Sequence, residues 1–500
     1  MTHSDRPVRK ITRREVLRQG LTLAAVAAWA PPAVWAGTAD GSSPIALGSR
    51  RELFLDDFLI ANMAGAELKL HKPESRNVAI ECDQPWEGNT SAYYTLFSDT
   101  DRFRMYYRGS HFDEKTKRSA HPEFTCYAES RDGLKWEKPE LGLFDFGGSK
   151  RNNILWTGAG THNFTPFKDG NPVCAADARY KALAGGTTTI AGKRAGCLNS
   201  LKSADGVRWT LMSEAVITAG AFDSQNLAFW DVARGEYRAY WRIFTAGYTD
   251  VRGWNPSGQR AIRTAASSDF IHWERQADLQ YVDSPHEHLY TNAVLPYFRA
   301  QHLLIDFPTR FKPKTQQVEP VFMSSRDGVV FRRWNEALIP ITAPKDRDGN
   351  RSNYMTWGLL QLPGNERDLS VYATEAYYRG PGSRVRRFTF RTDGFVSVHA
   401  GGEGAIVTKP LIFSGSQLFV NIASKGPTRI ELQDAHGKSL PGFTLEQCIA
   451  ITGDHIEQTV TWKSGELAAM AGKPVRLRFE LRDADLYSIQ FRYPRGGRTV

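Results

Sequence analysis

Cysteine and helical periodicity are both scarce in this chain of 500 residues. The cysteines are odd in number and widely spaced, without a C-x-x-C pair: Cys82, Cys126, Cys174, Cys197 and Cys448. This argues against a disulfide framework or a structural zinc site, although a bridge between Cys174 and Cys197 stays open. Aromatic and β-branched runs alternate with Gly, Asp, Asn and Pro turns, which predicts many short antiparallel strands.

Several signatures of enzyme classes are also absent. There is no G-x-S-x-G elbow, no H-E-x-x-H motif, and no Walker or Rossmann glycine signature between a strand and a helix. The basic residues form no run and no helical stripe, so nucleic acid is not an expected partner. His286 and His288 would share one face of a strand with no third ligand in view, so we expect no catalytic metal.

The first 36 residues predict an export signal. Arg13 and Arg14 form a twin arginine, and the apolar run 21–30 that follows is too short to span a bilayer as a stable helix. Val34 and Ala36 fit the −3 and −1 positions of a cleavage site. The pattern resembles a twin-arginine signal peptide, so we predict a periplasmic or extracellular protein with no membrane attachment after cleavage. An N-terminal membrane anchor is the alternative.

The positive charge has two interpretations. The net charge of +10 falls to +6 once residues 1–36, with six Lys or Arg and two Asp or Glu, are removed. Such a surplus suits an acidic polymer, for example a uronate-bearing or sulfated glycan. Spread over the rest of the chain, it is also an ordinary solubility feature.

A turn motif with the pattern S-x-D-[GF]-x-x-[WF] repeats along the chain. The aspartates of four copies, Asp132, Asp205, Asp269 and Asp327, are 73, 64 and 58 residues apart, and a weaker copy places Asp393 66 residues further on. In such a turn the Asp side chain caps backbone N–H groups and the aromatic ring anchors the hairpin. We therefore predict a structural role for these aspartates.

Each of these turns follows an earlier hairpin, and the hairpins begin near residues 92, 164, 227, 293 and 358. The starts are 72, 63, 66 and 65 residues apart. A regular spacing of this kind, with four strands per unit, is typical of blades arranged around an axis. The sequence therefore predicts an all-β fold built on a five-bladed β-propeller, with Glu52–Ile60 helping to close the ring. A structural cation in the central channel stays open, and no other cofactor is expected.

From about Gly402 the turn motif stops, and alternating apolar and polar residues predict a C-terminal β-sandwich. The expected strands are 411–413, 418–422, 428–433, 457–462, 475–481 and 486–493. The chain then divides into a signal peptide at 1–36, a propeller at 37–401 and a β-sandwich at 402–500. We expect the sandwich to cover one face of the propeller, and carbohydrate binding is its alternative role.

In a propeller, the start of the first strand and the end of the second strand of each blade meet at one mouth. Charged, amide and aromatic side chains occupy these places in the sequence, which predicts a binding site. From the strand starts and their neighbours come Glu87, Asn89, His162, Asn163, Asp223, Asn226, Glu287, His288, Tyr290, Asn292 and Trp357, and from the strand ends Arg108, Arg242, Asp306 and Glu375.

Carboxylates are frequent in this set, and cleavage of a glycosidic bond needs two of them on opposite sides of the bond. We select Asp223, Glu287 and Glu87 as candidate catalytic residues, with Asp56 or Asp57 as alternatives to Glu87. Burial and like charge at a shared mouth would raise the pKa of one carboxyl group, as a general acid requires. The other mouth residues are candidate substrate-binding residues, the arginines for an acidic or hydroxyl-rich sugar and the aromatic rings for its face.

Four stretches carry a resemblance to known enzymes: Glu52–Ile60, Phe222–Trp241, Tyr290–Pro296 and Tyr372–Phe395. With them the chain resembles the five-bladed β-propeller glycosidases of families 32, 43 and 68, and in particular a family 32-like bacterial branch. The resemblance spans the chain after the signal peptide, including the sandwich.

The resemblance implies a nucleophile or base in the first blade, a stabilising Asp in a middle blade and an acid Glu after it. By position, Asp223 matches the stabilising Asp and Glu287 the acid, while the first blade offers Glu87, Asp56 or Asp57. The N-D-P box is missing, Phe222-Asp223-Ser224 replaces R-D-P, and no E-C-P motif occurs at Glu287. The substrate therefore does not follow from the resemblance.

We predict an exported glycoside hydrolase that cleaves an oligo- or polysaccharide with paired carboxylates at the propeller mouth. The alternative is a non-catalytic carbohydrate-binding propeller, and a polysaccharide lyase or phosphorylase is a third interpretation. The sequence leaves open the sugar, the linkage and the oligomeric state.

Overall fold

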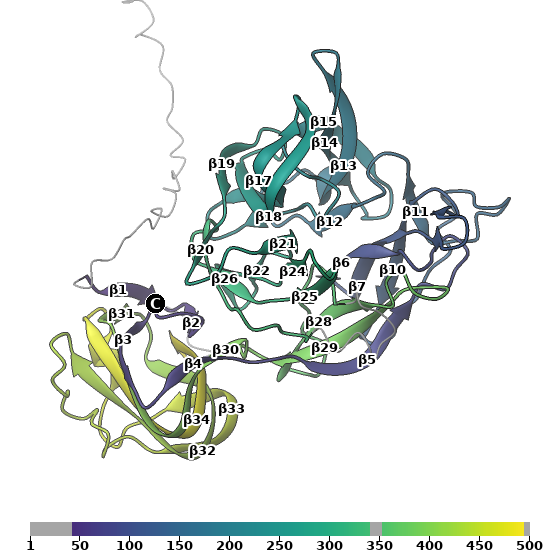
Figure 1. Cartoon of the computed structure of the whole chain (residues 1–500). Coiled ribbons are helices and arrows are strands. Elements are labelled where there is room, and N and C mark those ends of the chain that lie inside the picture. Colours follow the sequence, from purple (N-terminus) through teal and green to yellow (C-terminus); the bar gives the residue numbers. More distant parts are fainter. Residues whose placement is uncertain (1–42, 341–352, 495–500) are drawn as a thin grey trace, which may run out of the picture. The chain divides into compact units, whose positions relative to one another are not determined.

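The computed structural model describes residues 43–340 and 353–494 (Figure 1). The predicted signal peptide lies outside these residues. Within them the chain forms β-strands and two short 3-10 helices, η1 (Ala176–Ala178) and η2 (Leu467–Met470), and no α-helix. The prediction of an all-β fold is confirmed. No helix in this part of the chain has the length and apolar character needed to cross a membrane.

Three four-stranded antiparallel sheets follow one another along the first half of the chain. The first contains β6 (Ala92–Asp99), β7 (Arg102–Gly109), β10 (Phe124–Ser130) and β11 (Ile154–Thr157). The second contains β12 (Thr165–Lys168), β13 (Tyr180–Ile190), β14 (Lys193–Ser203) and β15 (Thr210–Ile217). The third contains β16 (Leu227–Asp231), β17 (Glu236–Asp250), β18 (Gly253–Ser267) and β19 (Glu274–Asp278).

Two further sheets come next. The fourth contains β22 (Leu295–Tyr297), β23 (Ala300–Asp306), β26 (Met323–Ser325) and β27 (Val330–Arg333), with β20 (Gln280–Val282) parallel to β27. The fifth contains β28 (Asp368–Glu375), β29 (Arg384–Arg391) and β5 (Glu74–Glu81). Smaller sheets join β21 (His288–Thr291), β24 (Thr309–Lys312) and β25 (Gln317–Pro320), and β8 (Phe112–Asp113) with β9 (Arg118–Ser119).

The predicted hairpin starts agree closely with the structure. The strands β6, β12, β16 and β22 begin at Ala92, Thr165, Leu227 and Leu295. The fifth start corresponds to a segment that bridges β28 through the pairs Met355–Ala373 and Leu360–Ser370. The alternation of apolar runs and turn residues was therefore sufficient to locate the units of the fold.

The inner segments of successive sheets contact one another. Strand β12 lies beside both β6 and β16. Ser224, just before β16, donates to the Tyr290 carbonyl at 2.7 Å, and the Trp357 ring donates to the Val294 carbonyl at 2.8 Å. The Trp357 backbone N–H lies 2.9 Å from the carbonyl of Tyr94 in β6. The contacts thus lead from the first sheet to the fifth and back to the first, as a propeller requires, while the number of blades stays a prediction.

The four clear copies of the turn motif are built as predicted. One carboxylate oxygen of each aspartate accepts hydrogen bonds from two backbone N–H groups; for Asp132 these come from Leu134 and Lys135 at 2.8 and 2.9 Å. The equivalent bonds at Asp205, Asp269 and Asp327 are 2.7 to 2.8 Å long. The structural role of these aspartates is confirmed.

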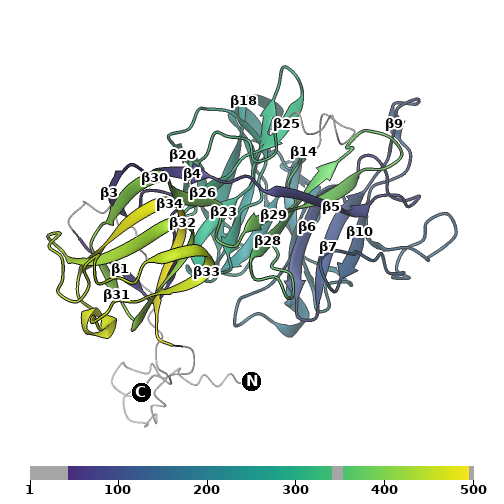
Figure 2. The same ribbon diagram turned by 90° about the horizontal axis from the view of Figure 1, so that it is seen from below.

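The C-terminal strands join the first strands of the described chain in one nine-stranded sheet (Figure 2). From the N-terminal side come β1 (Ile45–Gly48), β2 (Arg51–Leu53), β3 (Ile60–Ala64) and β4 (Glu67–Leu70). From the C-terminal side come β30 (Val396–Thr408), β31 (Leu411–Phe413), β32 (Gln417–Asp434), β33 (Ile451–Val460) and β34 (Val475–Arg492). Two predicted strand pairs are single long strands, β32 and β34, and the description as a sandwich stays a prediction.

The segment that completes the last sheet differs from the expected one. Glu52–Ile60 was expected to close the ring, but its first residues belong to β2, which pairs with β34. Strand β5 instead pairs antiparallel with β29, from Glu81 opposite Arg384 to Glu74 opposite Thr389. Leu53 and Leu55 pack in one hydrophobic core and Phe54 in another, so this segment connects the two cores.

All five cysteines are free, and the optional Cys174–Cys197 bridge is not formed. Cys82, Cys126, Cys197 and Cys448 are buried, and they pack as small apolar side chains.

The fifth turn aspartate, Asp393, has a different role from the other four. It is fully buried and accepts hydrogen bonds from Arg51 at 3.1 Å, Ser488 at 2.8 Å, Tyr297 at 2.5 Å and Arg299 at 2.9 Å. Burial acts to raise the pKa of this carboxyl group, but the two arginines and the hydrogen bonds hold it below the ordinary value. Asp393 therefore ties strands that are far apart in the sequence.

We expect Asp393→Asn to lower the free energy of unfolding by about 3–5 kcal/mol, because it leaves the buried Arg51 and the half-buried Arg299 without their shared anion. Urea denaturation at neutral pH measures the loss. The matched control is Asp132→Asn, which keeps an oxygen acceptor for its turn and should cost less than about 1 kcal/mol. Equal losses in the two variants would contradict the role assigned to Asp393.

Candidate functional site

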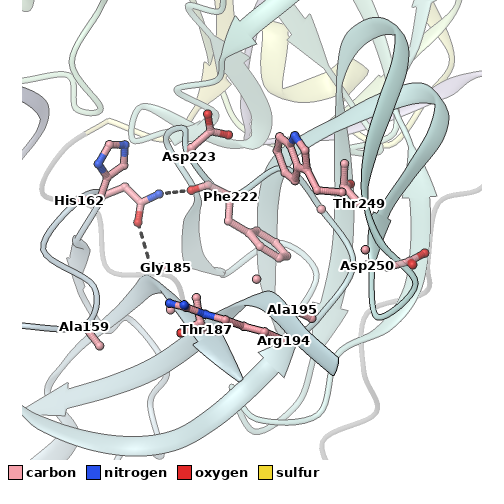
Figure 3. Close-up of a pocket in the computed structure, with 16 residues that line it drawn as sticks. Ala159, His162, Gly185, Thr187, Arg194, Ala195, Phe222, Asp223, Thr249 and Asp250 are labelled. Carbon is pink, nitrogen blue, oxygen red and sulfur yellow. Dashed lines mark hydrogen bonds between the residues drawn. The ribbon is translucent and has the colours of Figure 1, made fainter. Parts of the chain in front are cut away.

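A cleft with a volume of about 420 Å³ lies beside two long hairpins (Figure 3). Its lining from the β13–β14 hairpin is Gly185, Gly186, Thr187, Arg194, Ala195 and Gly196, and from the β17–β18 hairpin Thr249, Asp250, Gly253 and Trp254. His162, Asn163, Phe222 and Asp223, together with Ala159 and Gly220, complete it. The cleft thus lies where the second and third sheets meet, at the predicted strand starts.

Asp223 is the exposed acid of the cleft. Its side chain is 56% exposed. The carboxylate forms a hydrogen-bonded ion pair with Arg242, whose side chain is 2% exposed. The two residues come from the start of the third sheet's first strand and the return of its second strand. The predicted meeting of these two positions is therefore seen in this sheet.

Two asparagines hold the Asp223 turn in place. The Asn163 amide donates to the Ser224 carbonyl at 2.8 Å, and the Asn226 amide donates to the Phe222 and Ser224 carbonyls, both at 2.8 Å. The Asn163 side-chain oxygen accepts from the Gly185 N–H at 2.9 Å, and a β-carbon at Gly185 would lie 2.7 Å from that oxygen. Asn163 and Asn226 are therefore positioning residues for the backbone around Asp223.

Three arginines pack on tyrosine rings near this turn, and one of them, Arg260, was not selected from the sequence. The guanidinium carbon of Arg242 lies 4.8 Å and that of Arg260 5.2 Å from the ring centroid of Tyr290. Arg108 lies 4.9 Å from the ring centroid of Tyr93. Cation–π contacts of this kind fix the planes of the guanidinium groups but leave their edges available to a ligand.

A smaller cavity of about 100 Å³ adjoins the cleft. Tyrosines dominate its lining: Tyr93, Tyr94, Tyr290, Tyr354, Tyr377 and Tyr378. The Tyr93 hydroxyl donates to the backbone carbonyl of Asp223 at 3.1 Å, which connects the two spaces. Burial raises the pKa of Tyr93 well above its ordinary value, so its hydroxyl remains a donor at neutral pH.

Backbone strain gathers at the same place. Tyr93 and Tyr378 both have positive φ angles, 56° and 60°, in the left-handed region that side chains with a β-carbon rarely adopt. Such conformations cost free energy and persist where the surroundings enforce them, often at functional sites. The Tyr378 N–H donates to the Asn89 carbonyl at 2.7 Å, which helps to hold this geometry.

His162 reaches the cleft with a carboxylate behind it. Its Nδ1 lies 3.0 Å from the carboxylate of Glu123, and Arg108 lies 3.0 Å from the same ring nitrogen. Burial acts to raise the pKa of the Glu123 carboxyl group. The hydrogen bond from His162 and the charge of Arg108 outweigh this, so the pKa lies below its ordinary value and the group stays ionised. Glu123 was missed in the sequence because it lies just before the third strand of its sheet, β10, and only first-strand starts and second-strand ends were considered.

The structure does not bring Glu287 to Asp223. Its carboxylate accepts from Arg333 at 2.8 Å and from Arg310 at 3.1 Å. Side chains alternate between the faces of a strand, and Glu287 lies on the face of Leu289 and Arg310, opposite that of His288 and Tyr290. His288 does contact Arg260, because its Nδ1 accepts from the Arg260 backbone N–H at 3.2 Å and lies 3.5 Å from the Arg260 Nη1.

Glu87 is likewise held elsewhere. Its carboxylate is fully buried and accepts from Tyr107 at 2.5 Å and from Lys138 at 2.7 Å, while Asn89 bonds the backbone of Phe112. Of the alternatives, Asp56 pairs with Arg326 at 3.1 Å. These contacts resemble those of a structural ion pair, and the catalytic role of Glu87 stays a prediction.

The remaining predicted residues lie deeper in the fold. Glu375 is fully buried between Arg384 and Arg386, at 2.9 and 2.5 Å. Asn292 donates to the Gln225 carbonyl at 3.1 Å, and Trp357 packs in the core. Asp306 is also fully buried and accepts from the Ala293 N–H at 2.6 Å.

No group of three or more His, Cys, Asp and Glu side chains in the described ranges is arranged to hold a metal ion. A cation bound by carbonyl and hydroxyl oxygens in a central channel is a different kind of site, and that part of the sequence analysis stays a prediction.

Comparison with known proteins gives structural matches alone. No family model and no curated protein matches the sequence. The solved structures similar to this chain include a family 32 β-fructofuranosidase from Bombyx mori, with 10% identity over 85% of this chain and 95% of that one and a TM-score of 0.39. An endo-arabinase from Bacteroides thetaiotaomicron matches with 11% identity over 62% and 96% of the two chains and a TM-score of 0.37. An N-acetylgalactosamine deacetylase from F. plautii matches with 12% identity over 66% and 96% and a TM-score of 0.44.

The pH dependence of stability should report Asp306. Burial raises the pKa of this carboxyl group to about 8, and its second oxygen has no hydrogen-bond partner among the described residues. An acid whose pKa is raised on folding stabilises the protein fully below its unfolded pKa of about 3.9, and this contribution is lost as the pH rises toward the folded value.

We therefore expect Asp306→Asn to raise the free energy of unfolding at pH 8 by about 1–3 kcal/mol, because the neutral amide removes the penalty of a buried, unpaired charge. Denaturation curves at acidic and alkaline pH should show a flatter pH dependence in the variant than in the natural protein. The same pH dependence in both proteins would mean that Asp306 does not carry this effect.

Proposed function

We propose that the protein is a glycoside hydrolase that binds an oligo- or polysaccharide in the cleft at Asp223. One observation supports this most: an exposed carboxylate in the cleft is paired with an arginine that is almost fully buried. The size of the cleft is within the range of small-molecule sites, and Trp254, 60% exposed, lines it as a flat apolar surface for a sugar ring.

Asp223 suits the role of nucleophile or base. Its carboxylate is exposed to the cleft beside Arg242, where it can attack an anomeric carbon or remove a proton from water. The reaction also needs a carboxyl group on the other side of the bond. Among the described residues, Asp250 also lines the cleft, where it pairs with Arg252, and Glu123 contacts His162 of the lining.

The finer architecture belongs to the same proposal. We take the five sheets as the blades of a five-bladed propeller that forms a catalytic domain, and the nine-stranded sheet as a β-sandwich domain. The closed series of contacts among the inner segments supports the propeller. We also propose that the twin-arginine signal exports the protein to the periplasm or the cell exterior.

A carbohydrate-binding propeller without catalysis is the second candidate. It is favoured by the contacts of the other two predicted catalytic residues, because Glu287 is bound by Arg310 and Arg333 and Glu87 by Lys138. Such contacts are typical of structural ion pairs and occupy oxygens that a sugar would otherwise contact. The two candidates differ in whether a product is released.

Product release from a panel of plant, algal and bacterial glycans tests the proposal. We expect turnover of at least one glycan, and we expect Asp223→Asn to lower its rate by ~100-fold or more, as for loss of an acid or base. Because Asp223 is the carboxylate partner of the buried Arg242, the variant should lose some stability, and the rates are compared well below its melting temperature. Tight binding of a glycan with no product over long incubation would instead establish the binding protein.

Two further variants test the roles of the ion-paired carboxylates Glu287 and Glu87. If Glu287→Gln and Glu87→Gln lower the melting temperature but keep most of the turnover, both residues are structural. A loss of turnover at unchanged melting temperature in Glu287→Gln would restore its predicted role as the acid and contradict the interpretation of its arginine contacts.

Trp254 should contribute to sugar binding without contributing to folding. We expect Trp254→Ala to weaken glycan binding by about 3- to 10-fold, in line with the free energy of an aromatic contact. Titration calorimetry with the glycan that binds most tightly measures the change, and Trp230→Ala, on the first strand of the same sheet but outside the cleft, is the control for loss of an indole ring. Unchanged affinity in Trp254→Ala would place the sugar elsewhere.

A further inference from the structure

The arginine cluster at the cleft has more hydrogen-bond donors than the protein uses. Arg242 and Arg108 are 2% and 4% exposed, yet Nε and Nη1 of Arg242 and Nε of Arg108 have no partner among the described residues. The Nε of Arg260 is also buried and without a partner there. Since buried donors are nearly always hydrogen-bonded, these groups indicate a ligand or bound water.

The arginines of the cluster outnumber the described carboxylates that pair with them. Asp223 pairs with Arg242, and Glu123 is shared between Arg108 and His162. For Arg260 the described contacts include no carboxylate, and its side-chain hydrogen bond goes to His288 at 3.5 Å. Burial and the charge of Arg260 lower the pKa of His288, so this partner is neutral at neutral pH.

The positive charges also act on one another. Burial, followed by the nearby charge of Arg242, lowers the pKa of the Arg260 guanidinium group. Two guanidinium groups pack on the same ring, Tyr290, and one carboxylate pairs with one of them, so a positive charge is left unbalanced. An incoming anion would remove this imbalance.

The available space limits the size of that anion. The tyrosine-lined cavity beside the cluster has a volume of about 100 Å³, against about 420 Å³ for the cleft, so it suits a substituent better than the sugar ring itself. Arg108 donates to the Tyr377 hydroxyl at 3.0 Å, so the cluster contacts the wall of this cavity directly.

We propose that Arg242, Arg260 and Arg108 form a subsite for an anionic substituent, a carboxylate or a sulfate ester, of the sugar bound in the cleft. This rests on the proposed carbohydrate ligand and names its class: uronate-bearing or sulfated glycans. The planar guanidinium groups offer paired N–H donors that match the oxygens of both anions.

The test compares each acidic oligosaccharide with its own neutral form. The acidic probes are oligogalacturonides and chondroitin oligosaccharides. Each is compared with a form whose carboxyl groups are reduced to alcohols, and chondroitin is also compared with a form whose sulfates are removed. Titration calorimetry at constant ionic strength gives the affinities. We expect at least one acidic form to bind ~10-fold or more tightly than its neutral form, as for a hydrogen bond to a charged group. The form that retains affinity identifies the carboxylate or the sulfate as the anion.

Variants assign the preference to the cluster. Arg260→Gln should abolish the preference for the acidic form, and Arg260→Lys should restore part of it. The matched control is Arg263→Gln, because Arg263 lies on the same strand, faces the opposite side and pairs with Asp278. The control should keep the natural preference.

Equal affinity for acidic and neutral forms, or binding of neither, would overturn the subsite. Failure of the proposed function looks different, since acidic oligosaccharides that bind but release no product would leave the subsite in place. Conversely, turnover of a neutral glycan with no preference for acidic ones would keep the hydrolase and remove the subsite.

Discussion

The pairing of β5 with β29 brings the beginning and the end of the five sheets together, and the candidate site depends on it. Once Glu74–Glu81 is held against Arg384–Arg391, the residues that follow it lie beside the last sheet. Ser383 then donates to the Ser91 carbonyl at 2.9 Å, and Arg108 reaches the hydroxyl of Tyr377. The tyrosine-lined cavity is therefore built from residues nearly 300 positions apart. A loss of this pairing would remove one wall of the site without touching Asp223.

Among the described residues, the buried charges of the structural clusters have all their hydrogen-bond partners, whereas those of the candidate site do not. Asp393 and Glu375 are fully buried, and arginines and hydroxyl groups surround their oxygens. Such closed networks stabilise the fold because no charge is left without a partner. Arg242 is equally buried but has two nitrogen donors without a partner among the described residues. A protein gains little stability from such a group, so its presence is more simply explained by a ligand.

Local signals in the sequence were enough for much of the fold. The four turn aspartates and the hairpin starts follow from residue types within a few positions, which is why they agree with the structure. Asp223 and Arg242 were also found, because the start of one strand and the end of the next lie together in any antiparallel hairpin. The long-range pairing of β5 was not found, since nothing in Glu74–Glu81 marks its partner 310 residues later in the chain.

Physical reasons also explain why some predicted site residues lie away from the cleft and why Arg260 was not predicted. Glu287 stands one position before β21, and a shift of a single residue moves a side chain to the other face of a strand. The partner of Glu87, Lys138, comes from another part of the chain, so the ion pair could not be anticipated. Arg260 was missed because it lies in the middle of a long strand, opposite Phe244, where only the hairpin register brings it to the cleft.

A crystal structure of the Asp223→Asn variant with a bound oligosaccharide tests directly whether the cleft at Asp223 is the carbohydrate site. The account predicts a sugar ring in the cleft, in contact with Trp254 and with the side chain at position 223, and an acidic substituent directed at Arg242 and Arg260. A sugar bound on the nine-stranded C-terminal sheet, with the cleft empty at a saturating concentration, would contradict it.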